Sequence, residues 1–208
     1  MAQFVIHRGL IISVIQCIFS LVFYSIAIPI YNGFLMLGYT TVYTMLPVLC
    51  IIFDEDVSEE KAMQYPQLYQ TLQKGRELNL KTFLIWLWKS IYQGSMIMLL
   101  GFWLFEDSVV QIVTITFTAL IISELLNVYT ALTHLNRIVL LSQLLTFLIY
   151  IASIVFLRQQ INVSAIDFTF IRRVGIIVLI SWGPMQVIKM LRKALDPTEN
   201  EKIMKSMK

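Results

Sequence analysis

The stretch that decides the fold is residues 9–53, GLIISVIQCIFSLVFYSIAIPIYNGFLMLGYTTVYTMLPVLCIIF, which contains no Asp, Glu, Lys, Arg or His. A transmembrane helix needs about 20 consecutive, mostly apolar residues, so this run is long enough for two helices. Pro29 and Gly33 lie between its halves, and these residue types favour a tight reversal of the chain. The stretch therefore predicts a hairpin of two membrane helices.

The composition of the whole chain also indicates a membrane protein. Of its 208 residues, 58% are hydrophobic and 14% are charged, with a mean hydropathy of +0.75, whereas soluble domains contain about 25% charged residues. A chain of this length that lies mostly in a bilayer has no room for a cytosolic catalytic domain. The sequence also lacks glycine-rich nucleotide motifs and Cys/His metal spacings. Its net charge of +3 lies mostly beside the apolar runs, where it sets topology and does not indicate a nucleic-acid partner.

The pattern of apolar runs predicts an all-α, polytopic membrane bundle with six transmembrane helices. The first run is too long for a signal peptide, so we expect an uncleaved first span. The expected organisation is a helical hairpin over residues 1–53, a cytosolic loop over 54–81, a four-helix membrane segment over 82–190 and a cytosolic tail over 191–208. The expected spans cover residues 10–28, 34–53, 83–105, 109–129, 138–157 and 174–190.

The positive charges predict how this bundle is oriented. Cytosolic loops carry an excess of Lys and Arg. Twelve of the 16 such residues lie on the side that holds the N-terminus, the 54–81 loop, the 130–137 loop and the tail, and three lie in the loop at 158–173 on the other side. Both termini are therefore expected in the cytosol. Asn162 heads an Asn-Val-Ser sequon in the loop at 158–173, but it lies so close to the bilayer that we favour an unmodified residue.

Two ionisable residues are expected at membrane depth, Lys89 in the third span and Glu124 in the fourth. At 1.5 Å per helical residue, both lie about 9–10 Å below the cytosolic surface, and a short turn joins their spans. Two interpretations stay open. Either Lys89 and Glu124 form an intramembrane ion pair, or Lys89 snorkels to the headgroups beside Trp86 and Trp88.

Other polar residues inside the spans have simpler expected roles. Ser123 and Asn127 share a helix face near Glu124, and such groups hold spans together more often than they line a pathway. The two histidines, His7 and His134, are expected near the membrane surface, with no catalytic partner.

The second span carries a proline among polar residues, in the segment Tyr43-Thr44-Met45-Leu46-Pro47. A proline inside a membrane helix leaves a carbonyl without its usual donor. The segment therefore predicts either a simple kink or a partly unwound helix that offers carbonyls and hydroxyls to a substrate at mid-depth.

Short motifs are spread over nearly the whole chain. They are His7 to Ser13, Phe23-Tyr24, Tyr31 to Met36, Tyr43 to Pro47, Asp54 to Val57, Tyr65-Pro66-Gln67-Leu68-Tyr69, Lys74 to Leu78, Lys81 to Trp86, Phe117 to Leu120 and Glu124-Leu125. Together they resemble the C-terminal membrane half of a type IV P-type ATPase, a phospholipid flippase. The short uncharged hairpin and the Asp54-Glu55-Asp56-Val57 segment resemble the endosomal and Golgi subgroup, which works without an accessory subunit.

The resemblance implies a part of an ATP-driven translocase that moves phospholipid from the luminal or exoplasmic leaflet to the cytosolic leaflet of Golgi or endosomal membranes. The family's phosphorylated Asp in a DKTG segment and its nucleotide domain are absent from this sequence. ATP and magnesium would therefore bind a missing N-terminal catalytic portion of the same protein, and we expect this chain alone to bind no cofactor and not to hydrolyse ATP. The alternative is a truncated isoform, or a small multi-span membrane protein, with a structural or interaction role.

The resemblance also implies which residues border the lipid headgroup path, because in the family the fifth and sixth helices do so. Most flippases have Lys-Asn where this chain has Ser25-Ile26, so contacts assigned to that pair are not carried over. The implied roles are headgroup hydrogen bonds for Tyr24, Ser25, Tyr43 and Thr44, a ring lining the path for Phe23 and a kink at Pro47.

Overall fold

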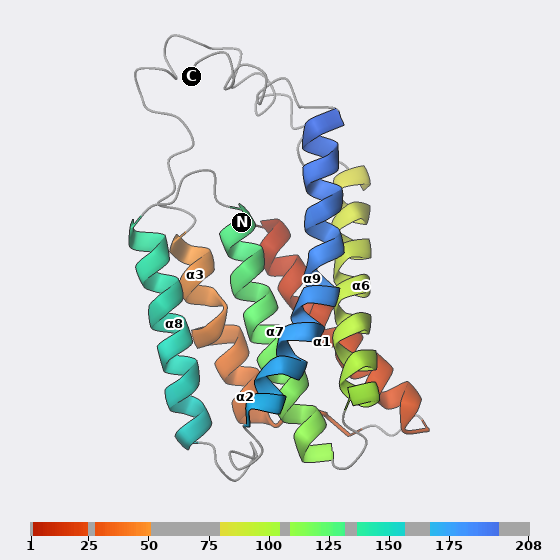
Figure 1. The fold of residues 1–208 in the computed structure, drawn as a ribbon, viewed down its shortest axis with the longest axis vertical. Helices are drawn as coiled ribbons and strands as arrows, with labels where there is room; N and C mark the ends of the chain where they lie inside the picture. The colour runs from red at the N-terminus through yellow and green to blue at the C-terminus, as the bar shows by residue number, and fades with distance from the viewer. Residues whose placement is uncertain are drawn as a thin grey trace.

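A computed structural model describes residues 2–24, 28–50, 80–104, 109–131, 137–156 and 167–195 (Figure 1). The elements in these ranges are α1 (Ala2–Val22), α2 (Gly33–Gly38), the π-helix η1 (Tyr39–Tyr43), α3 (Met45–Cys50), α6 (Leu80–Leu104), α7 (Val109–Ala131), α8 (Arg137–Phe156) and α9 (Phe168–Leu195). The described part of the chain contains helices and no strands, which confirms the all-α prediction. Ser25, His134, Asn162 and most of the loop expected at 54–81 lie outside the described residues.

Four of the described helical segments are long and apolar enough to cross a membrane: Gln3–Val22, Thr82–Leu104, Val109–Thr130 and Phe168–Arg192. Gly33–Leu49 and Val139–Val155 are shorter apolar helical segments. The outer surface of the bundle carries many large apolar side chains, such as Leu141, Leu179 and Trp103, as expected where lipid replaces water as the solvent. The structure therefore agrees with a multi-pass membrane bundle, and four helices of its described part have the length and composition of a span.

The limits of two helices differ from those expected. α1 begins at Ala2 and ends at Val22, whereas the charge pattern predicted a span over 10–28. It includes His7 and Arg8, because other helices, and not water, provide the partners of these polar side chains. α9 begins at Phe168 and contains Pro184, so the arginines at 172 and 173, which were expected in a loop, lie in its first turns.

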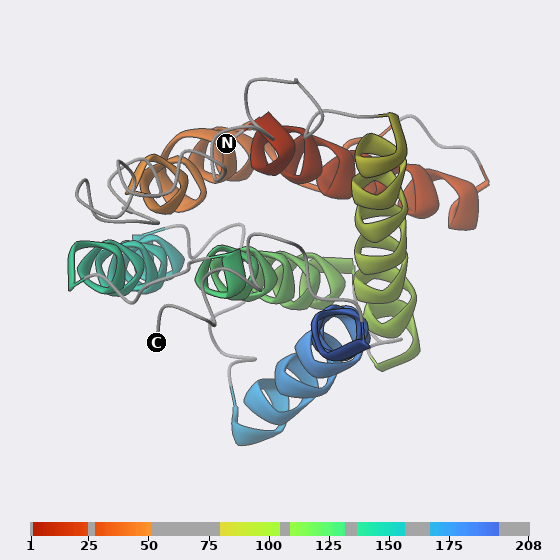
Figure 2. The same cartoon turned by 90° about the horizontal axis from the view of Figure 1, so that it is seen from above.

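Seen along the bundle, four helical segments form two rows, and α6 and α9 lie at one side of them (Figure 2). α1 and the α2–η1–α3 segment make one row, and α7 and α8 make the other. α1 packs mainly on α6, α9 packs on α6 and α7, and α3 packs on α8. The N-terminal end of α1 and the C-terminal end of α9 lie at the same end of the bundle (Figure 1).

An aromatic core joins the second helical segment, which is α2–η1–α3 with Tyr31 just before it, to α7 and α8. The Tyr43 ring lies 6.2 Å from the Phe117 ring and 5.5 Å from the Tyr150 ring, between centroids. The Tyr31 hydroxyl donates to Thr116 Oγ1 at 3.1 Å, and the Tyr150 hydroxyl lies 2.8 Å from that of Thr118. Buried tyrosines need such partners, so the core fixes the segment in both position and orientation.

Candidate functional site

The second helical segment is not a continuous α-helix. After α2 it continues as the π-helix η1, turns at Thr44 and resumes as α3. The Thr44 hydroxyl donates to the Tyr39 carbonyl at 2.6 Å. Pro47 has no N–H to offer the Tyr43 carbonyl, so the regular ladder is interrupted at this point. The described segment is thus more distorted than a simple proline kink.

Arg8 of α1 clamps this irregular segment. Its Nη1 donates to Thr44 Oγ1 at 2.9 Å and to the Thr40 carbonyl at 3.3 Å. In return, the Tyr39 hydroxyl donates to the Arg8 carbonyl at 3.0 Å. These three hydrogen bonds, which we call the Arg8 clamp, join α1 to the irregular segment, and one of them gives a donor to a backbone carbonyl of the π-helix, that of Thr40. Sequence reasoning overlooked Arg8, which was counted only as a topological charge.

The residues expected along a lipid path fall into two separate groups. Tyr43, Thr44 and Pro47 are buried beside the Arg8 clamp. Phe23 lies at the opposite end of α1, about 22 Å from Arg8 at 1.5 Å per residue, where its ring packs 4.7 Å from the Phe19 ring. Tyr24 follows it and is 97% exposed. The structure does not bring the two groups together.

A buried polar cluster joins α1, α6 and α7. It consists of His7, Ser90, Gln93, Glu124 and Asn127, all at most 5% exposed. His7 Nδ1 lies 2.6 Å from Ser90 Oγ. Asn127 Nδ2 lies 3.2 Å from His7 Nε2 and donates to Gln93 Oε1 at 3.2 Å. We call these five residues the His7 cluster.

His7 was expected near the membrane surface with no catalytic partner, but it is buried inside the protein and pairs with the Ser90 hydroxyl. A histidine near the start of a sequence is expected at the membrane interface because of its position. Here α1 begins before His7, so the side chain lies between α1, α6 and α7. The polar pair Ser123 and Asn127 was the sequence signal for a buried polar contact at this place. Asn127 does hold helices together, as predicted, because its amide bonds to residues of α1 and α6.

Lys89 and Glu124 are placed apart in the described structure. The Lys89 ammonium lies 4.7 Å from the centroid of the Trp86 ring, a cation–π contact. Among the described residues, the basic group within ion-pair distance of Glu124 is His7, with Nε2 3.6 Å from Oε1. The Lys89–Glu124 pair stays a prediction, and Trp86 is the partner that the geometry gives to Lys89.

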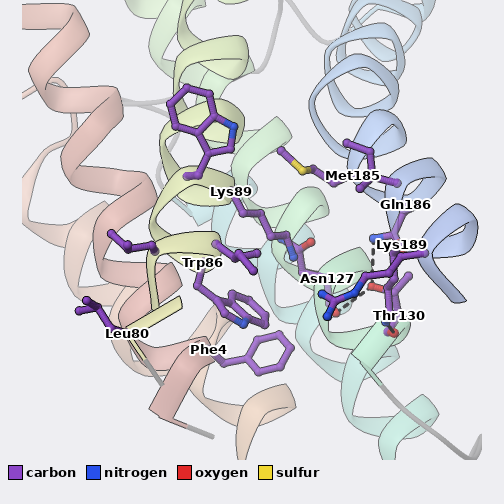
Figure 3. A pocket seen from close by; sticks show the side chains of 14 residues that line it. Phe4, Leu80, Trp86, Lys89, Asn127, Thr130, Met185, Gln186 and Lys189 are labelled. Carbon is purple, nitrogen blue, oxygen red and sulfur yellow. Dashed lines mark hydrogen bonds between the residues drawn. The ribbon is translucent and has the colours of Figure 1, made fainter. Parts of the chain in front are cut away.

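Lys89 also borders a pocket of about 870 Å³ between α6, α7 and α9 (Figure 3). The α9 side contributes Lys189, whose Nζ donates to the Thr130 carbonyl at 2.6 Å, and Gln186, which donates to Thr130 Oγ1 at 3.3 Å. Most other lining residues are apolar, including Phe4 and Trp88. In the part of the chain that the structure describes, no group of three or more His, Cys, Asp or Glu side chains is placed to hold a metal ion.

Comparison with known proteins finds relatives that are all named phospholipid-transporting ATPases. Residues 1–198 match the family model for the phospholipid-translocating P-type ATPase C-terminal region. The chain is 46% identical over 204 residues to probable phospholipid-transporting ATPase IIB of Bos taurus. It is 39% identical over 204 residues to probable phospholipid-transporting ATPase tat-5 of Caenorhabditis elegans and 35% identical over 207 residues to phospholipid-transporting ATPase NEO1 of Saccharomyces cerevisiae.

These alignments also show how much of a relative the chain represents. Each covers 98% of this chain, but the chain spans only 18% to 19% of the length of these relatives. The matched region is their membrane-embedded C-terminal part, and the all-helical bundle described above agrees with that. The chain belongs to the phospholipid-translocating P-type ATPase C-terminal family.

Proposed function

We propose that this chain is the membrane part of an ATP-driven translocase that moves phospholipid from the luminal or exoplasmic leaflet to the cytosolic leaflet. The observation that carries the proposal is 46% identity over 98% of the chain to a probable phospholipid-transporting ATPase. ATP and magnesium would bind an N-terminal catalytic portion of the same protein. The chain itself would receive the motion that phosphorylation drives.

We further propose six spans with both termini in the cytosol, in Golgi or endosomal membranes and without an accessory subunit. The domain limits expected from the sequence go with this topology: a hairpin over 1–53, a cytosolic loop over 54–81, a four-helix segment over 82–190 and a tail. The shared end of the bundle for the start of α1 and the end of α9 supports an even number of crossings. The positive charges at that end support a cytosolic side.

Within this bundle, α1 and the α2–η1–α3 segment would border the headgroup path. Tyr24 is open to a headgroup in the arrangement seen here, and Phe23 and Ser25 flank it along the chain. Tyr43 and Thr44 are buried, so they would meet a headgroup only after the segment moves away from α1. Since Pro47 and the π-helix already interrupt the backbone ladder, this segment needs to break fewer backbone hydrogen bonds to move than a regular helix would.

The test is a chimera in which this chain replaces the matching C-terminal part of a relative. The chimera is purified and reconstituted in vesicles that contain a fluorescent phospholipid. We expect vanadate-sensitive ATPase activity that phospholipid stimulates, together with ATP-dependent movement of the labelled lipid to the leaflet facing the catalytic portion. The relative's N-terminal part alone should show neither activity.

Two results would count against the proposal. A folded chimera that hydrolyses ATP without any response to phospholipid would contradict the role as a lipid-moving membrane part. Lipid movement that is independent of ATP would instead favour the small multi-span alternative. The control is the same N-terminal part joined at the same junction to the C-terminal part of another known relative, which shows whether the junction itself damages the protein.

A further inference from the structure

The hydrogen bonds of the His7 cluster fix the tautomer of its histidine. The Ser90 hydroxyl donates its one proton to the Trp86 carbonyl at 2.9 Å, so Ser90 Oγ must accept from His7 Nδ1–H at 2.6 Å. The Asn127 amide nitrogen can only donate, so His7 Nε2 accepts from it at 3.2 Å. With the Asn127 amide nitrogen facing the ring, as in the arrangement seen here, His7 is neutral and carries its proton on Nδ1.

A neutral His7 leaves Glu124 without a charged partner within ion-pair distance among the described residues. Glu124 is 5% exposed, and its Oε1 is buried without a hydrogen-bond partner. The nearest basic atom among the described residues is His7 Nε2, 3.6 Å from Oε1, and that atom carries no proton. An ionised carboxylate that is buried without a partner costs far more free energy than a neutral carboxylic acid at the same place.

The other charged or titratable groups around Glu124 are already engaged elsewhere. From α1, the Arg8 guanidinium donates to Thr40 and Thr44. From η1, the Tyr39 hydroxyl donates to the Arg8 carbonyl. From α6, the Lys89 ammonium lies over the Trp86 ring. From α9, Lys189 donates to the Thr130 carbonyl. None of these groups replaces His7 as the neighbour of the carboxyl group in the described part of the chain.

We propose that Glu124 is a proton-binding site within the membrane, occupied by one proton in the arrangement seen here, and that this proton holds α1 against α7. The site is defined by Glu124 and a neutral His7, with Ser90 and Asn127 holding the imidazole. The proposal concerns proton binding alone and does not depend on the proposed lipid transport.

The proton has one short route within the cluster. When it moves, the O–H bond at Glu124 breaks, an N–H bond forms at His7 Nε2, and the products are a carboxylate and an imidazolium. Asn127 Nδ2 must first leave Nε2, because the ring nitrogen has a single lone pair. Proton transfer therefore requires the Asn127 amide to leave the ring, which a shift of α1 relative to α7 would bring about.

The docking of α1 should then depend on pH in both directions. Raising the pH removes the proton and leaves a buried carboxylate, so the docked state, which binds more protons, loses stability. Lowering the pH enough to add a second proton to His7 leaves a buried imidazolium beside a neutral acid, which also disfavours docking. The contact of α1 with α7 is thus expected to be tightest between these two limits.

The test uses the full chain in nanodiscs of phosphatidylcholine, with two spectroscopic measurements at neutral pH. Because the sequence has 2 histidines, a His134→Asn variant leaves His7 as the single source of imidazole ¹⁵N signals. We expect a protonated Nδ1 and an unprotonated Nε2. Infrared spectra should show a carbonyl band of a buried carboxylic acid that is lost in Glu124→Gln. The band should persist in Asp167→Asn, which alters the exposed carboxylate that caps α9.

Either of two results would overturn the proposal: an imidazole protonated on Nε2, or an infrared spectrum from which Glu124→Gln removes a carboxylate signal instead of an acid signal. A Lys89→Met variant distinguishes this proposal from a Lys89–Glu124 ion pair. The ion pair requires the acid band to grow when Lys89 is removed, whereas the proton site requires an unchanged band. If Glu124→Gln does not insert correctly, the ¹⁵N spectrum of the chain with an intact cluster still tests the tautomer, and protonation on Nε2 would overturn the proposal.

Discussion

α1 contacts α6 and the α2–η1–α3 segment in different ways. Against α6 the contact is close and largely apolar, and a Cβ atom at Gly94 would lie 2.9 Å from the Ile11 carbonyl oxygen and 3.0 Å from Val14 Cβ. Against the α2–η1–α3 segment, the contact depends on directional hydrogen bonds of the Arg8 clamp. Close packing has one good geometry, whereas hydrogen bonds can exchange partners. The contrast indicates that α1 and α6 move as one body, whereas the hydrogen-bonded contacts of α1 with η1 and with α7 can rearrange.

Gly94→Ala should have the largest effect, because the added methyl group meets a backbone oxygen that cannot rotate away. Overpacking a close contact costs about 1–3 kcal/mol. Relative to Gly175→Ala, which gains the same helix propensity, we expect the free energy of unfolding, measured by SDS titration of the chain in detergent micelles, to fall by this amount. The distance between α1 and α6, measured between paired spin labels, should increase.

Gly175→Ala is the matched control for this substitution. It is also a glycine within a helix, and a Cβ atom there would find nothing within 4 Å. Both variants gain the same helix propensity, about 1 kcal/mol, so the control should be neutral or slightly more stable. Equal stabilities of the two variants would show that the α1–α6 contact is not closely packed.

Arg8→Met tests the other side of α1 and should have the next largest effect. Met keeps most of the apolar stem and removes the donors to Thr44 and Thr40. Hydrogen bonds between membrane helices contribute about 0.6 kcal/mol each, with a maximum of about 1.7, so we expect a loss of roughly 1–2 kcal/mol in the same SDS titration. The control is Arg172→Met, which removes an exposed arginine near the start of α9.

Arg8→Met should loosen the contact of α1 with η1 and leave the contact of α1 with α6 unchanged. Hydrogen exchange of backbone amides in Arg8→Met should rise in η1 and stay unchanged in α6. If protection is lost equally in both helices, the clamp supports the whole bundle and the proposed division of α1 into a fixed and a movable side is wrong.

The sequence predicted the helices far better than their partners. Hydropathy predicted the all-α class, because a bilayer leaves few alternatives for an apolar run. It misplaced the start of α1 because the partners of His7 and Arg8 lie between 31 and 120 residues away, a separation at which no local pattern carries information. Pro47 correctly indicated a disturbed helix, but the π-helix depends on Arg8 and on Tyr39, which only the fold brings together.

Thr44→Val should have a smaller effect on the same contact. Val has nearly the same shape but removes the hydroxyl that donates to Tyr39 and accepts from Arg8. The loss of a buried hydrogen-bonding group typically costs about 1 kcal/mol. The control is Thr41→Val, an exposed position whose hydroxyl bonds within its own segment, to the Leu37 carbonyl. A loss in Thr41→Val as large as that in Thr44→Val would mean that the hydroxyl of Thr44 acts locally and not as part of the clamp.

Tyr24→Gly should have the smallest effect, and in the opposite direction. Tyr24 has φ 55°, and a left-handed conformation costs about 1–2 kcal/mol for a residue with a Cβ atom. Glycine relieves that cost but loses about 0.5–1 kcal/mol through the greater freedom of the unfolded chain. The net result should be a slight gain in the free energy of unfolding.

The same substitution at Tyr129, an exposed position within α7, gives the control, because glycine inside a helix costs about 1 kcal/mol. If Tyr24→Gly is as destabilising as Tyr129→Gly, the Tyr24 side chain contributes more than its exposure suggests, and the C-terminal end of α1 is held by that ring. If the gain is seen, this end is held by Phe23 against Phe19 and Phe102. In that case the fixed side of α1 extends along the whole helix, and the Arg8 clamp at its N-terminal end is where movement can begin.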